Sequence, residues 1–157
     1  MNIREILLIF ANPILWTAVT AWFAAQACKV VRELVVTGKL NLRALINLGG
    51  MPSSHTAFVT ATAVAVGFQD GFASSAFAVG AVVTIIVMVD AAGVRRAAGN
   101  QAAAINMIVE NLEAQGIALD KKLKELLGHT PAQVAAGAVL GAAAAVAAVC
   151  LGFIQSL

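Results

Sequence analysis

The sequence predicts an all-α integral membrane protein: a bundle of about four transmembrane helices with an amphipathic helical hairpin on the cytoplasmic side. Two observations predict this class. Of the 157 residues, 61% are hydrophobic and only 11% are charged, whereas soluble domains are closer to half apolar and a quarter charged. The apolar residues also gather in runs long enough to cross a bilayer. We expect residues 1–157 to form a single membrane domain.

The first two expected spans lie in the first half of the chain. Residues 6–28 contain no charged side chain, and Asn12-Pro13 within them is expected to kink or start the helix. Residues 54–68 form a shorter apolar run. Its length is near the lower limit for crossing a hydrocarbon core of about 30 Å.

The other two expected spans are residues 72–89 and 130–154. The last one begins with Thr130-Pro131, a capping residue followed by a proline, which is a helix-start signal. It also contains Gly137 and Gly141, which are four residues apart and therefore lie on one face of a helix. Small residues at this spacing are suited to close helix packing.

Residues 91–128 are predicted to form a hairpin of two amphipathic helices on or near the membrane surface. Apolar residues recur at helical spacing on both sides of a break at Gln115-Gly116. They are Ile105, Ile108, Val109 and Leu112 in the first half, and Leu119, Leu123, Leu126 and Leu127 in the second. Helices with one apolar face suit the boundary between lipid headgroups and water.

The basic residues predict the orientation of the bundle. Nine of the ten lie in two segments that fall on one side of a four-span arrangement: Lys29, Arg32, Lys39, Arg43, Arg95, Arg96, Lys121, Lys122 and Lys124. Because positive residues accumulate on the cytoplasmic side, we expect both termini outside, in a bacterial inner membrane or an equivalent membrane. The net charge is only +2, which gives no indication of a nucleic-acid partner.

The chain has only two histidines, and both fall on the expected cytoplasmic side at the start of a helix. His55 lies in the first turn of the span 54–68, and His129 immediately precedes the cap of the span 130–154. Unpaired backbone N–H groups and the macrodipole favour an anion at such a place. A single interfacial histidine is usually a polar anchor, whereas two in these positions favour a functional site.

The segment before His55 combines several features of an anion site. Gly49-Gly50 allows the backbone to approach a ligand closely. Pro52-Ser53-Ser54 adds hydroxyl donors and a helix-start signal. Three basic residues are expected at the same membrane level: Lys29, Arg95 and Arg96. Cations, hydroxyl groups and helix N-termini at one depth predict a phosphate-binding site.

Simpler interpretations of the charged residues remain open. Arg95-Arg96 is also typical of a stop-transfer signal or of a contact with lipid headgroups. Asp90, at the end of a span, is either solvated, paired with one of these arginines, or functional.

Three stretches together resemble the divergent phosphatidic acid phosphatase type 2 family, the branch of small membrane proteins related to acid phosphatases and vanadium-dependent haloperoxidases. They are GGMPSSHTA, DAAGVRRAAGNQA and LKELLGHTPAQVAAG, in this order along the chain. QACK, which begins at Gln26, matches an upstream element of the same branch. The resemblance covers residues 26 to about 141.

The resemblance implies phosphoryl transfer through a phosphohistidine. His129 resembles the nucleophile that attacks phosphorus, and His55 resembles the general acid that protonates the leaving oxygen. Lys29 resembles the leading phosphate-binding lysine, and Ser53 and Ser54 resemble donors to the phosphoryl oxygens. Neutral imidazole is a nucleophile near physiological pH, and imidazolium is an acid there, so the residue types suit these roles.

The chain departs from the family pattern at three positions. Ser54 replaces the glycine that is usual before the first histidine, and Leu123 stands where the superfamily has an arginine, six residues before the nucleophile. We expect Arg95 or Arg96 to replace that arginine.

The third departure is Gln133, four residues after His129, where the branch usually has the glutamate that orients the ring. An amide can orient an imidazole, but it does not stabilise the imidazolium as a carboxylate does. Glu125 and Asp90 are the candidate replacement acids, and Gln26 is a further supporting residue of the site.

The expected function is that of a membrane phosphatase acting on a lipid or isoprenoid phosphomonoester. We expect no metal and no cofactor, with phosphate or vanadate as site ligands, and no haloperoxidase activity. The first alternative is a non-catalytic binder or transporter of anionic lipid phosphates. The second is a structural membrane protein that packs through alanine and glycine. The alanine-rich last span is also compatible with a homodimer.

Overall fold

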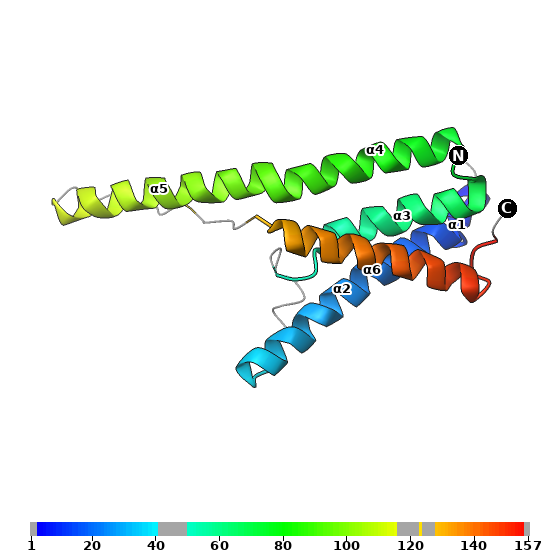
Figure 1. Cartoon of the computed structure of the whole chain (residues 1–157), viewed down its shortest axis with the longest axis horizontal. Coiled ribbons are helices and arrows are strands. Elements are labelled where there is room, and N and C mark those ends of the chain that lie inside the picture. The colour runs from blue at the N-terminus through cyan, green and yellow to red at the C-terminus, as the bar shows by residue number, and fades with distance from the viewer. Residues whose placement is uncertain (1–2, 41–49, 116–122, 124–127, 156–157) are drawn as a thin grey trace.

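The computed structural model describes residues 3–40, 50–115, 123 and 128–155, and this part of the chain is helical without strands. In Figure 1 the helices pack together as a bundle, and the helix Ser75–Ala114 extends beyond it. The predicted all-α fold is therefore confirmed. Parts of the two expected cytoplasmic segments, 41–49 and 116–127 apart from Leu123, lie outside the described residues.

The first expected span is two helices rather than one. α1 covers Ile3–Phe10, and α2 covers Pro13–Thr37. The break follows from Asn12, whose side chain accepts hydrogen bonds from the backbone N–H groups of Ile14 and Leu15 and so caps α2. The expected boundary at residue 6 is therefore wrong, because the asparagine cap and Pro13 start a new helix. The alternative, a helix start at Asn12-Pro13, is confirmed.

α3, from Ser54 to Asp70, is the central helix, because it contacts α2, α4 and α6. α6, from Pro131 to Cys150, packs closely on it through the two glycines singled out in the sequence. A side chain at Gly137 would collide with the carbonyl oxygen of Ser53, and one at Gly141 with that of Ala57. The predicted close packing at these glycines is confirmed.

The third expected span continues into the first helix of the expected hairpin. α4 (Ser75–Val89), a π-helical turn η2 (Asp90–Val94) and α5 (Arg95–Ala114) form one helix of 40 residues. Figure 1 shows that α5 continues the line of α4. The first half of the hairpin is thus helical as expected, and its place at the membrane surface stays a prediction.

The second half of the hairpin lies almost entirely outside the described residues. Only Leu123 is described, and it is held by Asn106 of α5. The side chain of Asn106 accepts a hydrogen bond from the Leu123 N–H at 2.8 Å and donates one to the Leu123 carbonyl at 2.9 Å. Leu123 therefore lies beside α5.

Three of the described helices are long and apolar enough to cross a membrane: α2, the 40-residue helix that begins with α4, and α6. α3 has 17 residues, which corresponds to about 25 Å at a rise of about 1.5 Å per residue. This is shorter than a typical hydrocarbon core. The expected number of four transmembrane helices is therefore not confirmed, although α3 lies inside the bundle.

Candidate functional site

The two histidines, 74 positions apart in the sequence, lie together at one end of the bundle. Their ring centroids are 6.3 Å apart. His55 is in the first turn of α3, which is capped by Ser53, and His129 immediately precedes Thr130, the cap of α6. Both helix starts were expected from the sequence, and the packing of α3 against α6 brings them to the same level.

Two backbone hydrogen bonds fix the position of His129. The N–H group of Ser53 donates to the carbonyl of Gln133 at 3.0 Å, which ties the start of α3 to the first turn of α6. The N–H group of His129 donates to the carbonyl of Ala91 at 3.0 Å, which ties it to η2. Gly128 allows this approach, because a side chain there would collide with the backbone of Arg96.

Lys29 reaches the same place from α2. Only 5% of this residue is exposed, and its Nζ atom donates to the hydroxyl of Ser54 at 3.2 Å. Within the described residues no carboxylate pairs with it, since the ion pair found there joins Asp90 and Arg95. A buried ammonium group is costly unless its charge is compensated, so this arrangement indicates an anion site.

The imidazole of His129 is buried, and one of its two nitrogen atoms lacks a hydrogen-bond partner. Only 5% of the residue is exposed, and its Nε2 atom is buried without a hydrogen-bond partner. Burial lowers the pKa of His129, and the positive charges of Lys29, His55 and Arg95 lower it further. The ring is therefore neutral at physiological pH. Because Nε2 is not accessible, a neighbouring side chain must move before a ligand can reach it.

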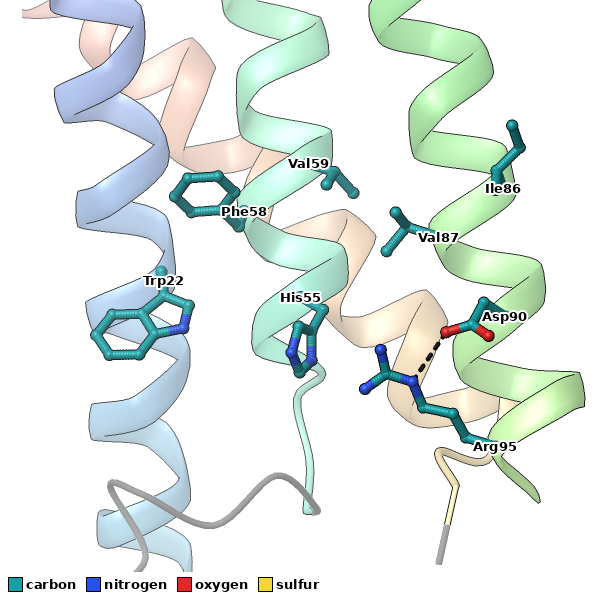
Figure 2. A pocket seen from close by; sticks show the side chains of 8 residues that line it. All are labelled: Trp22, His55, Phe58, Val59, Ile86, Val87, Asp90 and Arg95. Atoms are coloured by element: carbon teal, nitrogen blue, oxygen red, sulfur yellow. Dashed lines mark hydrogen bonds and ion pairs between the residues drawn. The ribbon is translucent and has the colours of Figure 1, made fainter. Parts of the chain in front are cut away.

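A pocket of about 540 Å³ opens beside His55, between α2, α3 and α4 (Figure 2). Its walls are mostly apolar, and its charged end contains His55, Asp90 and Arg95. The apolar lining residues are Trp22, Phe58, Val59, Ile86 and Val87. Lys29 and His129 do not line the pocket. They form a cluster with His55, because the two histidine rings lie 6.3 Å apart and the charge of Lys29 acts on both. His55 therefore belongs to both the pocket and the cluster.

Asp90 and Arg95 form an ion pair at the charged end of the pocket. The Nε atom of Arg95 donates to Oδ2 of Asp90 at 2.8 Å. Of the interpretations that the sequence left open for Asp90, pairing with Arg95 is thus the one that the structure shows. Arg96, its neighbour, is exposed and does not line the pocket.

The structure gives different positions to the other residues expected at the site. Ser53 faces its own helix, where its hydroxyl oxygen accepts from the N–H and hydroxyl groups of Thr56. Gln133 caps α6, because its Oε1 atom accepts from the Thr130 N–H at 3.0 Å. Gln26 is buried on α2. Glu125, a candidate orienting acid, lies outside the described residues.

The sequence analysis missed the apolar side of the site. Its residues are Trp22, Phe58, Val59, Ile86 and Val87. They carried no signal in the sequence, because they resemble any lipid-facing residue. Gly128 was missed as well, and its only signal was its position directly before His129. In the described ranges, no three His, Cys, Asp or Glu side chains lie close enough together to hold a metal ion.

The chain is similar to known proteins over most of its length. Residues 10–144 match the divergent PAP2 family. The chain is 40% identical over 144 residues to the "Uncharacterized membrane protein YuiD" of Bacillus subtilis (strain 168), an alignment that covers 85% of this chain and 91% of that protein. No solved structure matches the chain significantly.

Proposed function

Because the chain belongs to the divergent PAP2 family, we propose that it is an integral membrane phosphatase that hydrolyses a lipid or isoprenoid phosphomonoester. One observation carries this proposal. The buried Lys29 ammonium and the buried, unpartnered Nε2 atom of His129 belong to one cluster, in which the charge of Lys29 acts on His129. A phosphoryl group supplies what both lack, namely negative charge for the ammonium group and an electrophile for the imidazole.

The two histidines can divide the chemistry between them. The neutral ring of His129 attacks phosphorus, so that a P–N bond forms as the bond from phosphorus to the leaving oxygen breaks. His55 gives its proton to that oxygen, which leaves as an alcohol. Water then attacks the phosphohistidine, His55 takes a proton from it, and the P–N bond breaks to release inorganic phosphate. Lys29 and Arg95 offset the charge on the phosphoryl oxygens.

The pocket beside His55 supports the proposed substrate class. Its apolar walls and charged end match a molecule with a hydrocarbon part and a phosphate part. Such amphiphiles reside where this chain resides, in a membrane. The basic residues near the site favour its location on the cytoplasmic side, with both termini outside.

A second candidate is a binder or transporter of anionic lipid phosphates without turnover. One observation favours it: the Oε1 atom of Gln133 is used to cap α6 and is not available to orient His129. The site would then hold a phosphate with the same groups but would lack an acid to stabilise the imidazolium.

Phosphate release by the detergent-purified protein tests the proposal. A panel of lipid and isoprenoid phosphates would be compared with a water-soluble phosphomonoester, with and without vanadate. We expect release from an amphiphilic substrate, its inhibition by vanadate, and its loss in both His129→Ala and His55→Ala. Retained phosphate binding without any release would support the binder. Release that survives in both histidine variants would contradict the mechanism.

A further inference from the structure

The π-helical turn η2 brings Asp90 and Arg95 together, although they are five residues apart. In a regular α-helix, neighbours on one face are three or four residues apart, so residues five apart point in different directions. A π-helical turn instead hydrogen-bonds each residue to the one five positions before it. The N–H group of Arg95 donates in this way to the Asp90 carbonyl. The side chains of the same two residues then meet in the 2.8 Å ion pair.

The ion pair uses only one side of the guanidinium group. Arg95 bonds to Asp90 through Nε, which leaves its two terminal NH₂ groups, with four of the five donors, for another acceptor. Figure 2 shows these terminal nitrogens directed from Asp90 toward His55, at the charged end of the pocket. Two parallel donors of this kind match two oxygens of a phosphoryl group.

A carboxylate is an unexpected neighbour for an anion site. The negative charge of Asp90 repels a bound phosphate and offsets part of the attraction that Arg95 provides. The presence of Asp90 is explained if it orients Arg95, and if the affinity gained in this way exceeds the affinity lost by repulsion. An arginine side chain has many rotamers, and half of the Arg95 side chain is exposed. Without a partner it would lose considerable conformational entropy on binding a ligand.

We propose that Asp90 is a positioning residue. It holds Arg95 by Nε, so that the terminal NH₂ groups of Arg95 form a bidentate contact with the phosphoryl group of the ligand. This inference rests on the proposed function to the extent that it requires a phosphate site beside His55. It also explains how the chain functions with Leu123 where the superfamily has an arginine. The guanidinium group comes from the π-helical turn instead.

The proposal and simple electrostatics predict opposite results for Asp90→Asn. If Asp90 were only a nearby negative charge, its removal would strengthen the binding of an anion. If Asp90 positions Arg95, its removal weakens binding, on the order of tenfold, which is the effect of losing one charge-assisted hydrogen bond. Asp90→Glu keeps the carboxylate and is expected to recover part of the lost affinity.

The experiment measures the binding of inorganic phosphate and of vanadate to the full chain in detergent, by calorimetry, with thermal unfolding as a check of folding. Arg95→Lys removes the bidentate donor, and adding Asp90→Asn to it is expected to weaken binding no further. The matched controls are Asp70→Asn, at the far end of α3, and Arg32→Lys, which is exposed on α2. We expect both to bind as the wild type does.

The outcomes separate this inference from the proposed function. Tighter or unchanged binding in a folded Asp90→Asn protein overturns the positioning role, whether or not the wild type releases phosphate. Weaker binding in that variant, with recovery in Asp90→Glu, supports the role even if the wild type binds phosphate without hydrolysing a substrate. A wild type that binds neither phosphate nor vanadate overturns both proposals.

Discussion

Gly137→Ala is expected to impair the site, although Gly137 is eight residues from His129 along the chain. A Cβ atom at this position would stand 3.0 Å from the Cβ of Thr56 and still closer to the carbonyl oxygen of Ser53. The carbonyl belongs to the backbone that begins α3, so it cannot rotate away. α6 must therefore withdraw from α3, and it carries His129 with it.

The size of the effect follows from the contact distances. Ordinary Cβ contacts begin at 3.4 Å, so α6 must retreat by at least the 0.4 Å that separates 3.4 from 3.0 Å. A displacement on the order of 1 Å can cost about 100-fold in rate, so we expect a loss of roughly tenfold or more in kcat/KM. Alanine improves helix propensity by about 0.5–1 kcal/mol, whereas overpacking costs about 1–3 kcal/mol. The net effect is destabilising.

Gly80→Ala is the matched control, because it makes the same change in α4 where α4 meets α3. Its Cβ would lie 3.4 Å from Ala63, an ordinary contact, so the gain in helix propensity is not opposed. We expect unchanged phosphate release and equal or higher thermal stability. The assay is phosphate release by each purified variant beside its unfolding temperature in one detergent. Activity and stability of Gly137→Ala equal to the wild type would refute this account of the packing.

Three further predictions concern His129 and its surroundings. His129 must be neutral to attack, and because its pKa is lowered, the acidic limb of the pH profile is expected below the ordinary imidazole value of about 6.5. Lys29→Met removes one cause of the lowered pKa, so the pKa of His129 should rise. The acidic limb of the pH profile of kcat/KM should then move to a higher pH than in the wild type. Gln133→Glu preserves the capping box with Thr130, so thermal unfolding should show no loss of stability. Gly128→Ala would collide with the backbone at the start of α5, and unfolding measurements should show a loss of about 1–3 kcal/mol.

The sequence predicted those parts of the site that depend on local chemistry. Ser53 and Thr130 begin their helices as expected, because side-chain caps act within three residues and can be recognised in a short stretch. Family resemblance then predicted that the two histidines act together, and they lie 6.3 Å apart between centroids. The roles of His55, His129 and Lys29 as catalytic and binding groups stay predictions.

The sequence was less informative where a result depends on packing between distant segments. Gln133 was considered only for its position relative to His129, yet its side chain caps α6 because Thr130 is close in space as well as in sequence. Ser53 was expected to donate to phosphate, and the structure adds a contact that the sequence did not suggest, since its hydroxyl oxygen accepts from Thr56 within its own helix. The expected contact with phosphate stays a prediction. When a polar side chain has two possible hydrogen-bond partners, the sequence does not show which partner the fold brings closer.

The π-helical turn is the clearest case of a feature that the pattern of residues could not show. Asp90-Ala91-Ala92-Gly93-Val94 has no distinctive composition, and a regular helix would point Asp90 and Arg95 in different directions. The wider turn does two things at once: it pairs these side chains, and it presents the Ala91 carbonyl to the N–H group of His129. One irregular turn therefore links the arginine of the pocket to the proposed nucleophile. A substitution that restored regular α-helix geometry in this turn is expected to break both the Asp90–Arg95 ion pair and the hydrogen bond from His129 to Ala91. A substitution that removes only the ion pair is expected to leave that hydrogen bond intact.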